Sequence, residues 1–316
     1  MEKIKNRKRR EFIGKGISLG AAMGASLLLG DPEPLAAQMM PPDSPDLVAV
    51  KNGEPDVMFR KAIELMGGMG RFVQKGQTVL VKPNIAFPSA PEYGANTNPL
   101  LVKAVVEHCF AAGARKVFVL DNVAATSTGI AAQCYKNSGI EDAARGAGAV
   151  VAPGDHERYY QSVEIPGAVS LKTTKVHELL LESDAVINVP VAKQHGYTYL
   201  TAAMKNLMGV VWDRQHYHFN GLDQCIADFC LLCKPVLNVV DAYRVMMSNC
   251  PQGQGLSDVA LRKMLLLSSD IVAVDTAAAH LIGRDPAQVY YLKYGQAHNL
   301  GTMDLDRLNI LRHDLG

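Results

Sequence analysis

TVLVKPN (residues 78–84) opens with an unbroken run of Thr, Val and Leu and then turns polar at a proline. Such a run predicts a strand that is buried on both faces, as in a parallel sheet covered by helices. The pattern returns at residues 116–120 and 185–190. We therefore predict an α/β fold built on a mostly parallel open sheet with helices on both faces, either as one domain or as two fused lobes.

Helical stretches separate these apolar runs, as expected where parallel strands are joined by crossovers. Gly113 directly follows one of them and fits a C-terminal cap. We expect further strands at 149–151, 236–240 and 264–267, and a hairpin-like segment around 162–172. The expected helices span residues 56–73, 99–112, 131–147, 175–181, 199–210 and 271–282, with one more around residues 225–233.

Residues 1–37 differ in character from the rest of the chain. Arg9 and Arg10 stand in the twin-arginine pattern Arg-Arg-x-Phe-Ile-x-Lys, and an apolar stretch of 14 residues, 17–30, follows. A membrane-spanning helix needs about 20 apolar residues, so the stretch predicts an export leader rather than a permanent anchor. A disordered basic tail is the alternative, but it does not explain the flanking charges and prolines.

This interpretation divides the chain into a twin-arginine signal peptide over residues 1–37, a Pro-rich linker over 38–46 and an α/β domain over 47–316. It predicts a periplasmic or otherwise extracytoplasmic location, reached through the twin-arginine translocon, and no permanent membrane span.

Without the leader the chain is nearly neutral, because 25 basic and 27 acidic residues remain once its seven basic and four acidic ones are removed. No long basic run follows the leader. A chain of this charge has no overall field that would collect nucleic acid, so we expect no nucleic-acid partner. An anionic ligand must be held by local groups.

The six cysteines are too few and too unevenly placed for a small disulfide framework. Cys225, Cys230 and Cys233 have the C-x4-C-x2-C spacing of plant-type ferredoxins, which leaves an iron-sulfur cluster open. The segment lacks glycine, however, and its apolar residues recur as on a buried helix. Core thiols are therefore the favoured interpretation.

Polar residues stand where the apolar strands end. Lys82 and Asn84 end the first strand, Asp121 follows the second, and Lys193 and His195 follow the third. In open α/β sheets the ligand lies in the crevice beyond the carboxyl ends of the strands. We therefore expect the site at this edge. Asp241 and residues 268–270 end two further strands.

Five short motifs follow one another between about Val79 and Gly301. They are Val81-Lys82-Pro83-Asn84, the turn Asn96-Thr97-Asn98-Pro99, the stretch Asn188 to His195, Lys205-Asn206-Leu207-Met208-Gly209, and Asp270-x4-Asp275. In this order they resemble the family called domain of unknown function 362 (DUF362). Some members of that family carry ferredoxin-like iron-sulfur modules beside this domain. The resemblance implies a fold and a site, but no reaction.

The stretch after the third strand is the strongest candidate for binding an anion. Lys193, His195 and, at the start of the next helix, Lys205 can converge on one anion, with Lys82 approaching from the neighbouring strand. Ammonium groups brought close repel by about 1 kcal/mol per pair at the surface, so such a cluster indicates an anionic ligand. In the alternative, each lysine is solvated or pairs with Asp121, Asp241 or Asp270.

We expect Lys193, His195 and Lys205 to be catalytic, with His195 moving a proton. The expected substrate-binding residues are Lys82, Asn84, Thr97, Asp121, Asn206 and Asp241.

His216 and His218 form a possible divalent-metal site. In an extended segment alternate residues point the same way, and His195 together with an aspartate such as Asp241 would complete the ligand set. The alternative is that both histidines pack or cap, because His-x-His alone is a weak signal.

The common nucleotide and hydrolase signatures are absent from the sequence. Three functions remain open. The first is an exported enzyme acting on a small carboxylate or phosphate, the second an iron-sulfur or metal-binding redox protein, and the third a non-catalytic solute-binding protein.

Overall fold

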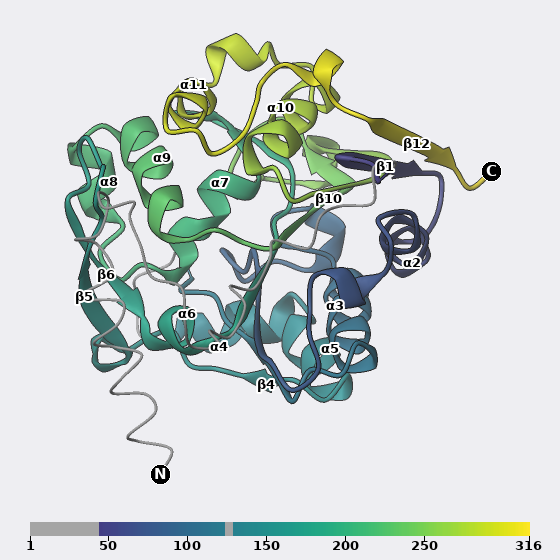
Figure 1. Cartoon of the computed structure of the whole chain (residues 1–316), viewed down its shortest axis with the longest axis horizontal. Coiled ribbons are helices and arrows are strands. Elements are labelled where there is room, and N and C mark those ends of the chain that lie inside the picture. Colours follow the sequence, from purple (N-terminus) through teal and green to yellow (C-terminus); the bar gives the residue numbers. More distant parts are fainter. Residues whose placement is uncertain (1–43, 124–128) are drawn as a thin grey trace, which may run out of the picture. The chain divides into compact units, whose positions relative to one another are not determined.

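A computed structural model describes residues 44–123 and 129–316, and residues 45–316 form one unit rather than two lobes. The predicted leader, its arginines Arg9 and Arg10 and most of the linker lie outside the described residues. Within the described part, the core of the unit is a sheet of eight strands (Figure 1). From edge to edge these are β12 (Ile310–Asp314), β1 (Leu47–Lys51), β11 (Val259–Ser268), β10 (Leu237–Met246), β7 (Ala185–Val189), β2 (Thr78–Pro83), β3 (Lys116–Val119) and β4 (Val150–Val151).

The sheet is mixed but mostly parallel, which confirms the predicted α/β fold. Strand β11 runs antiparallel to β1 and β10, and the other neighbouring pairs in the described sheet are parallel. After β2 the chain builds β3 and β4 on one side of it and then returns to place β7 on the other side. The order therefore reverses at β2, and such a reversal is where open α/β sheets bind ligands.

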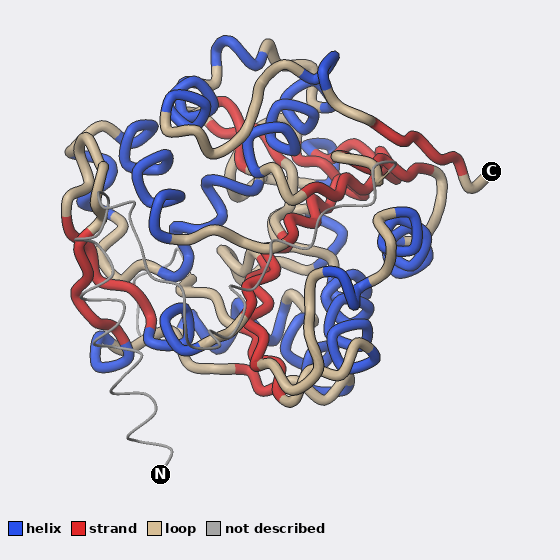
Figure 2. The backbone as a smooth tube through the Cα atoms, in the orientation of Figure 1, coloured by secondary structure: helices blue, strands red, loops and turns tan. Residues whose placement is uncertain are grey.

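Helices cover both faces of the sheet (Figures 1 and 2), because its strands are apolar on both sides. On one face Val79, Val81 and Val119 pack against the first group of helices, and on the other Leu80, Val186 and Val240 pack against the second. The first group is α2 (Pro55–Leu65), α3 (Pro99–Ala111), α4 (Ile130–Asn137) and α5 (Ile140–Gly146). The second is α6 (Glu178–Glu182), α7 (Ala203–Asn206), α8 (Gln215–Phe219), α9 (Leu222–Leu232), α10 (Ile271–Leu281) and α11 (Tyr290–Ala297).

Two small antiparallel pairs lie outside the main sheet. One joins β5 (Tyr160–Glu164) to β6 (Thr173–His177), and the other joins β8 (Lys193–His195) to β9 (Tyr199–Thr201). The 3-10 helices are η1 (Met69–Arg71), η2 (Pro91–Tyr93), η3 (Glu157–Tyr159), η4 (Leu207–Val210), η5 (Leu256–Asp258), η6 (Pro286–Gln288) and η7 (Leu305–Arg307).

Several predicted elements were wrong in type or extent. The helix expected over 131–147 is broken at Gly139, whose φ of 72° a helix interior does not allow. The segment 175–181 begins as strand β6, and 199–210 begins as strand β9 before α7 and η4. The elements within these two segments are only three to five residues long, which is too short for sequence periodicity to distinguish a helix from a strand.

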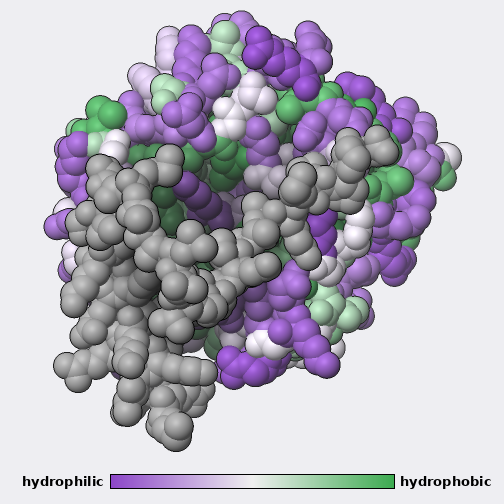
Figure 3. Space-filling view, in the orientation of Figure 1, coloured by the Kyte–Doolittle hydropathy of each residue, from purple (hydrophilic) through white to green (hydrophobic). Residues whose placement is uncertain are grey.

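The surface of the described part is largely hydrophilic on the face shown in Figure 3, with small scattered apolar areas. Among the described helices, none has both the length and the apolar composition that crossing a membrane requires.

Candidate functional site

A cavity of about 1240 Å³ opens beyond the carboxyl ends of the central parallel strands. Asn84 after β2, Asp121 after β3 and Lys193 after β7 all line it. Residues of α7, η4, α8 and the β5–β6 and β8–β9 pairs also line it. The order of strands reverses at this edge, which is also the edge where we expected the site from the sequence.

A row of buried asparagines forms the floor behind this cavity. Asn188 lies opposite Lys82 of β2 and Asn238 of β10 in the sheet register, and its Nδ2 donates to Oδ1 of Asn238 at 3.0 Å. Asn206 of α7 donates to Oδ1 of Asn188 at 2.8 Å and to the carbonyl of Lys82 at 3.1 Å. Asn84 donates to Oδ1 of Asn206 at 3.1 Å. The network fixes α7 against three strands, because each buried amide must keep its partners.

Lys82 and Asp121 form an ion pair next to this network. Their Nζ and Oδ1 atoms are 3.0 Å apart, and both side chains are almost completely buried. Lys82 also donates to the carbonyl of Pro83 at 2.5 Å, while Asp121 accepts the amide of Ile85 at 2.5 Å. Burial lowers the pKa of Lys82 and raises that of Asp121, and the contact between them opposes both shifts. The amine of Lys82 is thus held by the protein itself and lies outside the lining of the cavity.

Gly209 makes room for that pair. A Cβ at this position would lie 1.9 Å from Oδ1 of Asp121 and 2.6 Å from Nζ of Lys82. The backbone of Gly209 also accepts the amide of Asn122 at 2.7 Å. The residue must therefore lack a side chain for η4 to approach the ends of β2 and β3.

Lys193 lies at the inner wall of the cavity, with 1% of its surface exposed. Its amine donates to the carbonyl of Ala95 at 2.5 Å and to Oδ1 of Asn84 at 3.3 Å, and it lies over the ring of Phe87. Burial and the charge of Lys205 lower its pKa to about 7. The amine therefore exchanges its proton near neutral pH.

Lys205 is held in place through the N-terminus of the short helix α7. Asp275 of α10 accepts the amides of Ala203 and Met204 at 2.6 Å and 2.9 Å, which caps this helix. Burial and the charge of Arg214 lower the pKa of Lys205 to about 8. Among the described residues, the thioether of Met208 at 4.0 Å is the contact found for its amine.

His195 faces the same cavity from strand β8. Its Nδ1 accepts the amides of Tyr197 and Thr198 at 3.1 Å and 3.3 Å, so the proton of the neutral ring is on Nε2. Burial, then Lys205 and Lys193, lower its pKa to about 3. The neutral imidazole is thus a hydrogen-bond donor at Nε2, as in other sites where an unprotonated histidine polarises an oxygen.

The cationic groups of the cavity therefore influence one another. Burial is the first cause of each lowered pKa, and the next is a neighbouring cation: Lys205 for Lys193, His195 and His218, and Arg214 for Lys205. Arg214 donates to the carbonyl of Val123. The cavity collects positive charge that burial makes costly without an anion.

Comparison with known proteins identifies the domain. The family model described as "Domain of unknown function (DUF362)" matches residues 79–280. The chain belongs to this family. A thylakoid-associated protein of Synechocystis sp., sll1697, is 26% identical over 240 residues, which cover 73% of this chain and 71% of that protein.

Two solved structures are similar in backbone. The lactate racemase apoprotein of Thermoanaerobacterium thermosaccharolyticum has 12% identity and a TM-score of 0.48, with 76% of this chain and 58% of that chain covered. A protein of Thermotoga maritima has 13% identity and a TM-score of 0.47, with 73% and 60% covered. The chain thus spans about three fifths of the length of each. Likeness at this level carries no conclusion about what the DUF362 domain binds.

Three of the predicted substrate-binding residues of this DUF362 domain lie outside the lining of the cavity: Lys82, described above, and Thr97 and Asp241, which support the frame of the cavity. Thr97 donates to the carbonyl of Val189 at 2.7 Å and accepts the amide of Asn84, which ties the ends of β7 and β2 together. Asp241 accepts the amides of Asn98 and Tyr243 at 2.7 Å and 2.9 Å. The side chains of Thr97 and Asp241 thus form their hydrogen bonds with backbone groups of the protein.

The predicted metal ligands are not brought together. His216 and His218 lie on helix α8 rather than on an extended segment, and both line the cavity, but Asp241 does not. Asp241 is engaged with backbone amides elsewhere. Within residues 44–123 and 129–316, no three His, Cys, Asp or Glu side chains are grouped so that they could hold a metal ion.

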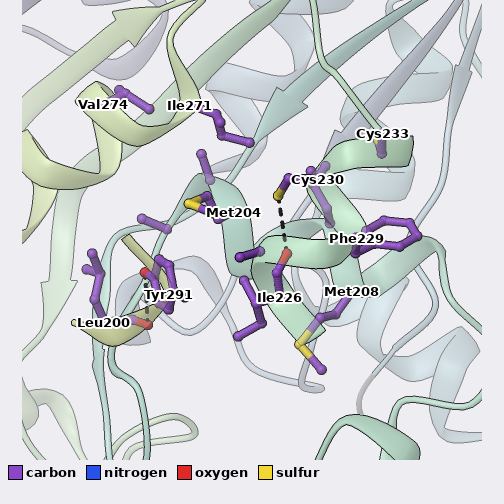
Figure 4. Packing of buried hydrophobic residues seen from close by; sticks show 14 of the residues in the cluster. Leu200, Met204, Met208, Ile226, Phe229, Cys230, Cys233, Ile271, Val274 and Tyr291 are labelled. Carbon is purple, nitrogen blue, oxygen red and sulfur yellow. Dashed lines mark hydrogen bonds between the residues drawn. The ribbon is translucent and has the colours of Figure 1, made fainter. Parts of the chain in front are cut away.

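Cys225, Cys230 and Cys233 are core thiols on and next to α9. All three belong to the apolar cluster, part of which Figure 4 shows, and Cys230 donates to the carbonyl of Ile226 at 3.3 Å. Burial raises the pKa of Cys225 to about 11 and that of Cys233 to about 12. Cluster ligation requires thiolates, which this environment disfavours. Their positions agree with the prediction that these three cysteines are core thiols.

Several residues of the site had no role in the sequence-based hypothesis. Asn188 and Asn238 looked like ordinary strand residues, although an amide within a doubly buried strand was a usable signal. Arg214 and Thr201 reach the cavity from segments without any recognisable pattern.

Proposed function

We propose that this protein is an enzyme that binds a small carboxylate or phosphate anion in the cavity beyond β2, β3 and β7. The observation that carries the proposal is the convergence of Lys193, Lys205 and Arg214 on one cavity, where burial and then a neighbouring cation lower the pKa of each lysine. A ligand anion removes that repulsion and is the natural partner of such a cluster.

The carboxylates of the cavity wall neutralise this charge only in part, although Asp121 does favour the charged form of Arg214. Asp121 is paired with Lys82, which offsets it, and Glu157 is paired with Lys175. Asp155 and Asp213 also line the cavity, but both are exposed at its outer part. The inner part keeps its excess of positive charge.

Catalysis is favoured over simple capture of a solute because both inner lysines titrate near neutral pH. A pKa of about 7 for Lys193 and about 8 for Lys205 suits amines that give and take protons. A binding protein gains nothing from cations that lose their charge in this range. His195, as a neutral donor at Nε2, is suited to hold an oxygen of the substrate rather than to move a proton itself.

Thermal unfolding with and without added phosphate or propionate tests the proposal. A ligand at 100 times its dissociation constant stabilises the folded state by about 2.7 kcal/mol, which gives a measurable rise in Tm. Lys193→Met should abolish the rise. The control is Lys103→Met, at an exposed lysine on α3 that contacts Glu107, and it should leave the rise unchanged. If Lys193→Met responds to both anions like the wild type, the cavity is not the anion site.

We further propose that the enzyme acts outside the cytoplasm. The support is the Arg9-Arg10 pattern, the short apolar stretch that follows it, and the small residues Ala36 and Ala37, after which we expect cleavage. Changing both arginines to lysine should keep the full-length chain in the cytoplasmic fraction, while the wild type is recovered, shortened, outside it. Equal distribution of the two would remove this part of the proposal.

A further inference from the structure

The three site lysines differ in what their amines contact. Lys82 donates to a carbonyl and pairs with Asp121, and Lys193 donates to the carbonyl of Ala95 and to Asn84. Lys205 lines the same cavity, yet among the described residues no oxygen is found within hydrogen-bonding distance of its Nζ. Its amine is the one left free to react with a bound molecule.

The surroundings of Lys205 favour the neutral amine. Burial and the charge of Arg214 lower its pKa to about 8, and Asp223 opposes them. Lys193, His195 and His218 are its other charged or titratable neighbours in the cavity. Compared with a lysine of ordinary pKa near 10.4, the neutral fraction at pH 7 is larger by roughly two orders of magnitude. A buried lysine beside another cation is a recognised way to make an amine nucleophilic.

Two further groups on the cavity wall suit a carbonyl substrate. Thr201, at the end of β9, has a buried hydroxyl for which the described residues provide no hydrogen-bond partner. His195 offers its Nε2 proton. One of these donors can hold a carbonyl oxygen while Lys193 and Arg214 hold a carboxylate. A 2-oxo acid carries both groups on adjacent carbons.

We propose that Nζ of Lys205 forms an imine with the carbonyl carbon of a 2-oxo acid, a step that rests on the proposed anion site and names its substrate class. The neutral amine adds to the carbonyl, so that a C–N bond forms and the carbonyl oxygen takes up a proton. The resulting carbinolamine loses that oxygen as water, which carries off both hydrogens of the amine. No oxidant or reductant is consumed. Lys193 then exchanges protons with the imine, whose protonated form withdraws electrons from the neighbouring carbon.

Borohydride trapping tests this step on the purified full chain. Protein mixed with pyruvate is reduced with sodium borohydride, digested, and mapped by mass spectrometry. The expected result is a reduced pyruvate adduct on Lys205 in most of the protein, with little on the exposed reference Lys103. Propionate has the carboxylate but no ketone and should give no adduct.

Variants of Lys205 separate its role as a nucleophile from the effect of its charge. Lys205→Arg keeps the cation and should lose the adduct while propionate still raises Tm, and Lys205→Met should lose both. Lys193→Arg should still be trapped at Lys205.

The outcomes distinguish the two proposals. No wild-type adduct on Lys205, or an adduct mainly on Lys193 or on exposed lysines, overturns the imine. If phosphate or propionate still raises Tm in that case, the anion site stands. If neither anion binds, the proposed function fails as well. If Arg214→Met forms the Lys205 adduct at the same level as the wild type, with a rate that still rises near pH 8 rather than closer to pH 10, the role assigned to Arg214 in activating the amine is contradicted.

Discussion

Replacing Gly209 with alanine should break the buried ion pair behind the cavity. The new methyl group would lie 1.9 Å from Oδ1 of Asp121 and 2.6 Å from both Cε and Nζ of Lys82, closer than real Cβ contacts come. Neither partner can withdraw easily, because Lys82 is fully buried and Asp121 is held by the amide of Ile85. The pair must therefore separate or η4 must move away from it.

The magnitude follows from the two costs involved. Overpacking a tight site costs roughly 1–3 kcal/mol, and leaving one charge of a buried pair without its partner costs roughly 3–5 kcal/mol. The two costs cannot be added, because the same displacement that relieves the overpacking also separates the ion pair. We therefore expect the free energy of unfolding to fall by about 3–5 kcal/mol. For a domain of this size that corresponds to a Tm lower by about 10 °C.

Urea unfolding followed by circular dichroism measures this loss directly. The matched control is Gly70→Ala, because a methyl group there meets no atom within 4 Å. It should change the free energy of unfolding by no more than about 0.5 kcal/mol. A Gly209→Ala protein that unfolds as late as the Gly70→Ala control would refute the account of the ion pair and of the role of Gly209.

Three further changes have expected outcomes. Asp275→Ala removes the acceptor for two amides of α7. It should lower the free energy of unfolding by about 1–3 kcal/mol, measured by urea unfolding, and reduce the propionate-induced rise in Tm. Asp275→Asn keeps one acceptor oxygen and should show a smaller loss in both measurements. The propionate-induced rise in Tm should be largest below pH 7 and decline as Lys193 and Lys205 lose their protons near pH 7 and 8; a constant rise up to pH 9 would contradict this. Without ligand, the effect of pH on stability has the opposite sign. Between the lowered pKa values of the two lysines and their ordinary value of about 10.4, the folded chain binds fewer protons than the unfolded chain. The free energy of unfolding should therefore increase with pH in this range, as urea unfolding would detect. Cys250, the partly exposed thiol, should react first with a thiol reagent in the native protein; earlier reaction of Cys225 or Cys233 would contradict their place in the core.

The central strands could be predicted because their sequence signal is local. The run at residues 78–84 is apolar in consecutive positions, and that pattern fits a strand buried on both faces. The edge strand β12 has no comparable signal, because it is partly exposed, and β1 has only a short apolar run, residues 47–50, and pairs with β12 from the opposite end of the chain. Their pairing is a long-range property that no window of sequence contains.

The location of the cavity could also be predicted, because it depends on topology. Lys193, His195 and Lys205 do line one cavity. Their division of roles could not be predicted, since it depends on which oxygen each amine reaches. In the sequence Lys82 could not be distinguished from Lys193. In the structure, Asp121 at the end of the neighbouring strand β3 forms an ion pair with Lys82.

The motif Lys205 to Gly209 illustrates why its residues occur together. Asn206 anchors α7 to the polar row on the sheet, and Gly209 lets the following turn approach the ion pair, so the backbone on both sides of Lys205 is fixed. A flexible lysine would lose much of its reactivity to the entropy of finding its partner. Fixing the backbone while leaving the amine without an oxygen acceptor among the described residues positions Lys205 but leaves its Nζ available to a substrate. That combination is the physical reason to seek the reacting amine at Lys205 rather than at Lys82 or Lys193, whose amines already donate to protein oxygens.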